Sequence, residues 1–124
     1  MTLNYLDFDY SEDTEGIGVF DAMASTGPLQ VPAVHAEIVA VLDWAHATFS
    51  ERRGPVGDGG EWDYDLHGMR ETSAPETIDY DPATRSLRVQ AGPAAAPRHT
   101  VSLSIGGTAA FCAAFRSRFE PDPQ

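Results

Sequence analysis

The stretch from Pro32 to Arg53 reads PAVHAEIVAVLDWAHATFSERR, and the fold is predicted outward from it. Its apolar residues recur with the helical period and form one stripe: Val34, Ile38, Val41, Leu42, Ala45 and Phe49. Proline suits a first helical position because its missing N–H would be unpaired there. Gly54 and Pro55 follow the stretch and favour a stop. Such an amphipathic helix needs a sheet or a second helix to cover its stripe.

Alternating apolar and polar residues predict strands on both sides of this helix. These strands cover residues 3–10, 17–25, 61–71, 77–80, 87–90 and 99–105. Asp81 and Pro82 open the connection between two of them and indicate a hairpin, since Pro presets φ and Asp bonds to the turn backbone. A second helix is expected to follow Thr108 as its N-cap and to end at Phe119.

The order of these elements, β-β-α-β-β-β-β-α, indicates one α+β domain that spans residues 1–124. Strands that alternate have one covered face and one wet face, which is typical of antiparallel sheets. We therefore expect a two-layer fold, with a mostly antiparallel sheet of about six strands and both helices on one of its faces.

Composition describes an ordinary globular chain, with 42% hydrophobic and 10% aromatic residues. Cys112 is the single cysteine and has no internal disulfide partner, which agrees with a reducing compartment. The first residues, MTLNYLDFDY, lack the basic and apolar regions of a signal peptide, and no run of apolar residues is long enough to span a membrane. A cytoplasmic location is expected.

Net charge is the informative number, with 19 acids against 8 bases and a net of −11. All the bases are arginine, and the many Ala, Gly and Pro residues suggest a GC-rich bacterial genome as a hypothesis. Residues 1–65 carry 13 acids and two arginines, whereas residues 66–124 are neutral overall. Such a field repels nucleic acid and acidic membranes and attracts a basic protein. The alternative is that the charge only keeps the protein soluble.

The leading hypothesis is a small acidic binding module that neutralises, chaperones or regulates a basic protein partner. Alternation places the acids of residues 3–10 and 61–71 on the wet face of the sheet. Two aromatic residues of the later strand are expected to anchor the partner if that strand is an edge strand. The predicted partner-binding residues are Asp7, Asp9, Trp62, Asp63, Tyr64 and Asp65.

A divalent-metal-dependent hydrolase is the alternative, with Asp63, Asp65 and His67 as ligands from one side of one strand. Successive side chains on one face lie about 7 Å apart, which is too far for close shared coordination without a third group. No combination of base, nucleophile and oxyanion donors is visible, so a non-enzymatic role without a cofactor is favoured. A homodimer is also considered, through the small side chains on one side of the long helix: Ala33, Ala36, Ala40 and Ala47.

Overall fold

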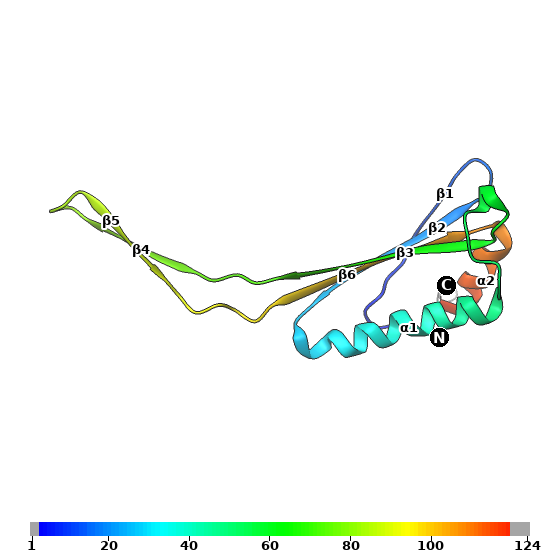
Figure 1. The fold of residues 1–124 in the computed structure, drawn as a ribbon, viewed down its shortest axis with the longest axis horizontal. Helices are drawn as coiled ribbons and strands as arrows, with labels where there is room; N and C mark the ends of the chain where they lie inside the picture. The colour runs from blue at the N-terminus through cyan, green and yellow to red at the C-terminus, as the bar shows by residue number, and fades with distance from the viewer. Residues whose placement is uncertain (1–2, 120–124) are drawn as a thin grey trace, which may run out of the picture.

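The computed structural model describes residues 3–119, and within them it has two α-helices and six antiparallel strands in the predicted order (Figure 1). The strands are β1 Asp9–Glu12, β2 Gly18–Thr26, β3 Trp62–Glu71, β4 Glu76–Asp81, β5 Ser86–Ala91 and β6 Arg98–Gly107. The helices are α1 Val31–Thr48 and α2 Ala109–Phe119, with single 3-10 turns η1 Pro28–Gln30 and η2 Val56–Asp58. The α+β class is confirmed.

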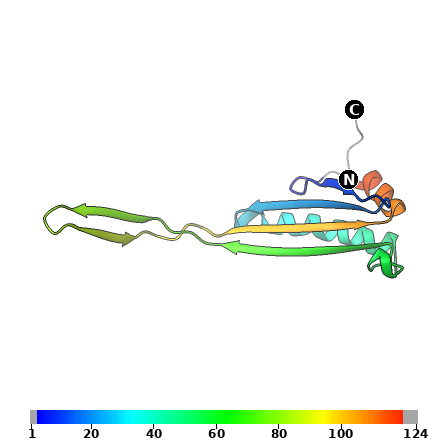
Figure 2. The same cartoon turned by 90° about the horizontal axis from the view of Figure 1, so that it is seen from above.

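The strands form two sheets rather than one sheet of six. Four of them form an antiparallel sheet in the order β1-β2-β6-β3, and β4 pairs with β5 in a separate hairpin. Figures 1 and 2 show that this hairpin continues β3 and β6 far beyond the rest of the molecule. We call residues 72–97 the arm and the remaining described residues the body. Pro75, Pro93 and Pro97 lie between the two sheets, where their missing N–H groups interrupt the ladder.

Both helices pack on one face of the four-stranded sheet, as expected. Aromatic rings connect the layers: Phe20 of β2 stacks on Phe115 of α2 at 4.2 Å between centroids, and Trp62 of β3 lies parallel to Phe111 at 5.8 Å. The buried core comprises Leu6, Phe20, Ala22, Ala24, Val34, Ile38, Val41, Ala45, Trp62, Leu103, Ile105, Phe111, Cys112, Phe115 and Phe119. The predicted stripe of α1 therefore faces the sheet, although Leu42 and Phe49 are only partly buried.

Helix α1 ends at Thr48, whereas the sequence predicts an end at Arg53. Phe49 leaves the helical conformation with φ −121° and ψ 56°, and its carbonyl accepts the indole N–H of Trp62 at 3.1 Å. A buried indole needs an acceptor, and the last carbonyls of a helix are unpaired. Residues 52–54 then bond to Glu61 and Trp62 at the margin of the sheet. Contacts with Glu61 and Trp62, which are distant in sequence, therefore end α1 before Arg53, and the local sequence signals do not reveal them.

The first strand is also displaced, from the predicted residues 3–10 to Asp9–Glu12. The predicted alternation is nevertheless present, because Leu6 is buried, Phe8 and Tyr10 pack against the core, and Asp7 is exposed. The backbone N–H groups of residues 4–6 bond to the carboxylate of Glu37 on α1. A buried side chain therefore replaces the strand partner that residues 4–6 were expected to have.

Two predicted local signals are confirmed. Thr108 caps α2, since its hydroxyl oxygen accepts the N–H of Phe111 at 3.3 Å. Asp81 opens the arm's turn, since its carboxylate accepts the N–H of Ala83 at 3.0 Å. Arg85 completes that turn in the left-handed region, with φ 54°.

Candidate functional site

The face of the four-stranded sheet opposite the helices is open and carries a row of aspartates. Strand register places Asp9 opposite Asp21, Asp21 opposite Ser104, and Ser104 opposite Asp65. Residues directly opposite each other in antiparallel strands point to the same face. We call Asp9, Asp21 and Asp65 the aspartate row. It has one carboxylate on each of β1, β2 and β3, and Ser104 of β6 lies between the second and the third.

A shallow hollow of about 480 Å³ lies over this row. Its wall includes two serines of the central strand β6 and side chains from the three other strands and the segment before β1. The polar residues that line it are Asp7, Asp9, Asp21, Asp65, His67, Ser102 and Ser104. The hollow is thus acidic, and it is wide enough to receive a long side chain from another molecule.

The charge of the aspartate row is not balanced within the described chain. Ion pairs among residues 3–119 join Arg52 to Glu61 at 3.2 Å and Arg53 to Asp63 at 2.9 Å, and neither involves Asp9, Asp21 or Asp65. Like charges directly opposite each other destabilise a sheet. Asp9 and Asp21 lie directly opposite each other and therefore repel, and a bound cationic group would relieve this repulsion.

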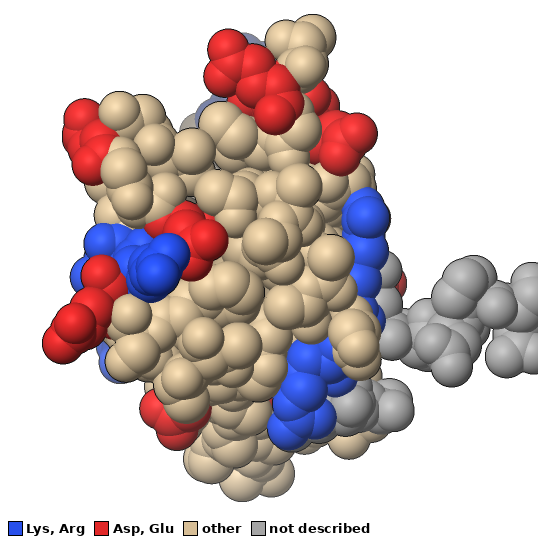
Figure 3. All heavy atoms as spheres, turned by 90° about the vertical axis from the view of Figure 1, so that its right-hand side faces the viewer, with Lys and Arg blue, Asp and Glu red and all other residues tan. Residues whose placement is uncertain are grey.

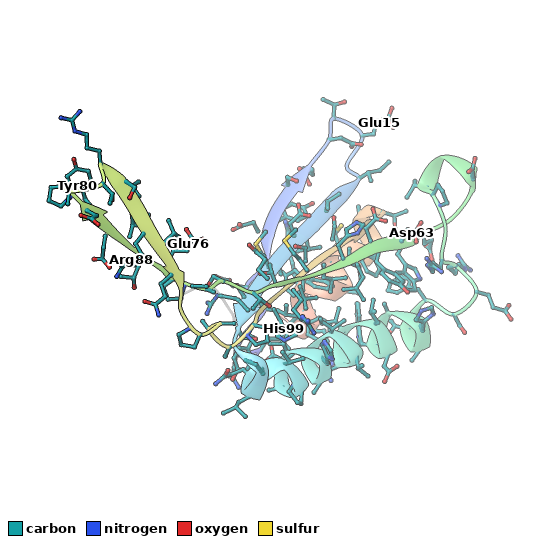
Figure 4. The ribbon with its side chains drawn as sticks, turned by 60° about the vertical axis from the view of Figure 1, so that its left-hand side comes forward. Glu15, Asp63, Glu76, Tyr80, Arg88 and His99 are labelled. Atoms are coloured by element: carbon teal, nitrogen blue, oxygen red, sulfur yellow. The ribbon has the colours of Figure 1, made fainter. Side chains whose placement is uncertain are left out.

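A second group of acids lies at the turn between β1 and β2. Figure 3 shows acidic side chains at the top of the end of the molecule opposite the arm, and Figure 4 labels Glu15 at this turn. Asp13 organises the turn, because its carboxylate accepts the N–H groups of Glu15 at 2.8 Å and Ile17 at 3.0 Å. These acids extend the negative field from the open face to the end of the body.

The predicted site residues of β3 have different environments. Asp65 joins the aspartate row, but Asp63 accepts the Nε–H of Arg53 and the backbone N–H of Tyr64, both at 2.9 Å. The Arg53 guanidinium lies 4.6 Å from the centre of the Tyr64 ring, which is partly buried. Trp62 is fully buried, so its predicted role as a partner anchor is wrong. Its ring fills the space between β3 and α2 instead.

The residues of the predicted metal site lie on one face of the sheet, but their side chains do not converge on one point. Asp63, Asp65 and His67 occupy successive rows, opposite Gly106, Ser104 and Ser102 of β6. Among residues 3–119, no group of three His, Cys, Asp or Glu side chains is arranged to hold a metal ion. The separation along the strand, about 7 Å per row, explains why the three do not converge.

Asp21 is the residue of this site that sequence reasoning missed. It is the only charged residue of β2, and most of the residues around it are apolar or small. Its neighbours Phe20 and Ala22 are buried, whereas Asp21 and Met23 are exposed on the open face. One charge in an otherwise apolar strand was the available signal that this face is wet.

Tyr10 lies at the margin of the body, where its hydroxyl donates to the Glu12 carboxylate at 2.6 Å. This bond, with burial as a second cause, raises the pKa of Tyr10 to about 12 from its ordinary 10.0. The folded protein thus favours the protonated phenol, and this stabilisation is complete below pH 10 and lost as the pH rises toward 12.

We expect phenolate absorbance to show one tyrosine that ionises near pH 12. Tyr10→Phe should remove that late step, because it removes the phenolic O–H that donates to the Glu12 carboxylate. Tyr80→Phe, at an exposed position on the arm, should leave it in place. If all tyrosine side chains of the folded protein ionised below pH 11, the hydrogen bond from Tyr10 to Glu12 would not form.

Comparison with known proteins finds no match: no family model, curated protein or solved structure corresponds to this chain. None of the helices among residues 3–119 combines the length and apolar character that crossing a membrane requires.

Proposed function

We propose that the protein is a binding module for a basic protein partner, which it holds on the open face of the four-stranded sheet. The observation that carries this proposal is the aspartate row, in which three carboxylates cross the sheet and none takes part in the ion pairs found among residues 3–119. Arginine or lysine side chains of the partner enter the hollow and meet carboxylates from several strands at once. Binding of this kind neutralises a basic surface on the partner.

Two further features support the proposal. The net charge of residues 1–65 is −11, so the field of the body attracts a basic protein from a distance and raises its association rate. The row is also carried by paired strands rather than by a mobile loop, so its spacing is set before the partner arrives.

The proposal is tested with the triple variant Asp9→Asn, Asp21→Asn and Asp65→Asn. A basic protein is first captured from bacterial lysate on the immobilised chain at 0.15 M salt, released by a salt step, identified by mass spectrometry and purified. We expect the variant to bind it with an association rate at least tenfold slower and with a weaker salt dependence. The variant's stability should be unchanged or up to about 1 kcal/mol higher, because like charges no longer face each other.

A matched control makes the same charge change away from the open face and from the turn between β1 and β2, with Asp43→Asn, Glu51→Gln and Asp58→Asn, all at exposed positions. We expect this control to slow association less than threefold. If the association rate fell equally in the two variants, net charge would act without a defined site. If it fell in neither variant, the proposal would be wrong.

A further inference from the structure

The arm has one apolar face and one polar face. Its register places Ile78 opposite Val89 and Tyr80 opposite Leu87, so these four side chains share one face of the hairpin. We call them the arm strip. The opposite face carries polar pairs, including Asp79 opposite Arg88. Figure 4 shows the hairpin projecting away from the body.

Nothing in the described chain covers the arm strip. Its four members are 55% to 63% exposed, although each is a large apolar or aromatic residue. A two-stranded hairpin alone in water is at best marginally stable and needs a packed face to persist. Large apolar side chains that cluster on an exposed surface mark an interaction site. The arm therefore has the form of a docking element.

The charge of the arm indicates which kind of molecule could bind to the arm strip. Residues 76–91 carry three acids and two arginines, a net of −1, whereas residues 1–65 carry −11. The arm thus has little attraction for the basic partner proposed above, and an apolar, nearly neutral surface matches it best. A second copy of the arm is such a surface, since the strip pairs with itself in a closed two-fold contact.

The length of the arm allows this contact despite the acidic bodies. Two arms that lie antiparallel, strip against strip, place the bodies at opposite ends. The ten residue-to-residue steps from Glu71 to Asp81 span about 33 Å, which is several times the screening length of about 8 Å at 0.15 M salt. At this distance, repulsion between the two acidic bodies is largely screened. A dimer formed through the open faces would instead bring the two acidic surfaces into contact.

We propose that the arm is a dimerisation element, in which the strips of two copies pack face to face. Four side chains of this size, more than half exposed, offer on the order of 400 Å² per copy, so the pair buries about 800 Å² in total. This is below the roughly 1,200 Å² of a standard stable interface. The dimer is accordingly a weak one, with a dissociation constant in the micromolar range or above.

Sedimentation equilibrium of the full chain, from about 5 µM to about 500 µM, tests this proposal. We expect a monomer–dimer equilibrium that the double variant Ile78→Thr and Leu87→Thr weakens at least tenfold. Threonine keeps the β preference of these positions while it removes apolar surface. The control is Leu29→Thr and Val39→Thr, which removes one exposed apolar side chain just before α1 and one midway along it, and which should leave the equilibrium unchanged.

Hydrogen exchange on the unaltered protein gives an independent measurement, because it does not depend on how the variants fold. Protection of residues 76–81 and 86–91 should rise with protein concentration in the same range. A chain that stays monomeric throughout, or arm protection independent of concentration, would overturn the proposal. So would a dimer that the control weakens as much as the arm variant does, because its interface would then lie on the long helix.

Discussion

Glu37→Ala is expected to destabilise the protein by about 3 kcal/mol, because it removes the acceptor for three backbone N–H groups. The Glu37 side chain is buried in α1, and its carboxylate oxygens accept N–H groups of Asn4 at 2.8 Å, Tyr5 at 3.0 Å and Leu6 at 3.1 Å. Hydrogen bonds to a charged group contribute about 1.5–3 kcal/mol each, and part of this returns when the freed segment is hydrated. Urea denaturation measures the change.

Asp43→Ala is the matched control on the same helix. Asp43 is exposed, so its removal should change stability by less than about 0.5 kcal/mol. Glu37→Gln keeps one carbonyl acceptor and should give an intermediate loss. Hydrogen exchange at Leu6 should accelerate in Glu37→Ala, since this segment is held to the body by that carboxylate. A loss below about 1 kcal/mol would mean that residues 4–6 are held by their apolar contacts alone.

Much of the fold follows from local periodicity. The alternation of β3 correctly separates buried Trp62 from exposed Asp65, because successive side chains of a strand point to opposite faces. The same alternation cannot distinguish a core strand from an arm strand. Ile78 and Tyr80 have the pattern of a half-buried strand, yet nothing in the described chain lies against them. Whether an apolar face is covered depends on other segments, which period alone does not reveal.

The site was predictable to the extent that alternation decides it. Asp7, Asp9 and Asp65 line one hollow, as expected for acids on the wet face. Alternation alone does not show that Asp21 belongs to the site, because Asp21 lies opposite Asp9 only through the pairing of β1 with β2. Glu37 escaped prediction for a similar reason. A carboxylate beside an apolar stripe suggests solvent exposure, and its backbone donors lie more than thirty positions away in sequence.

Trp62→Ala is expected to cost about 3–5 kcal/mol, the usual range for removing a fully buried aromatic side chain. The indole stacks on Phe111 at 5.8 Å, meets His46 edge-on at 4.9 Å, and donates its N–H to the carbonyl of Phe49. The substitution therefore leaves a cavity between β3 and α2 and removes one of the two N–H donors to the Phe49 carbonyl, which keeps its bond from the backbone N–H of Arg52. Chemical denaturation with the linear extrapolation measures the loss.

Trp62→Phe separates packing from hydrogen bonding, because it keeps an aromatic ring against Phe111 but removes the N–H donor. We expect it to cost about 1–3 kcal/mol, clearly less than the alanine variant. Binding of a captured basic partner should not respond to Trp62→Phe once the fold is intact, since the side chain does not reach the surface. If Trp62→Ala cost less than about 1 kcal/mol while partner binding fell, the indole would belong to the interface and not to the core.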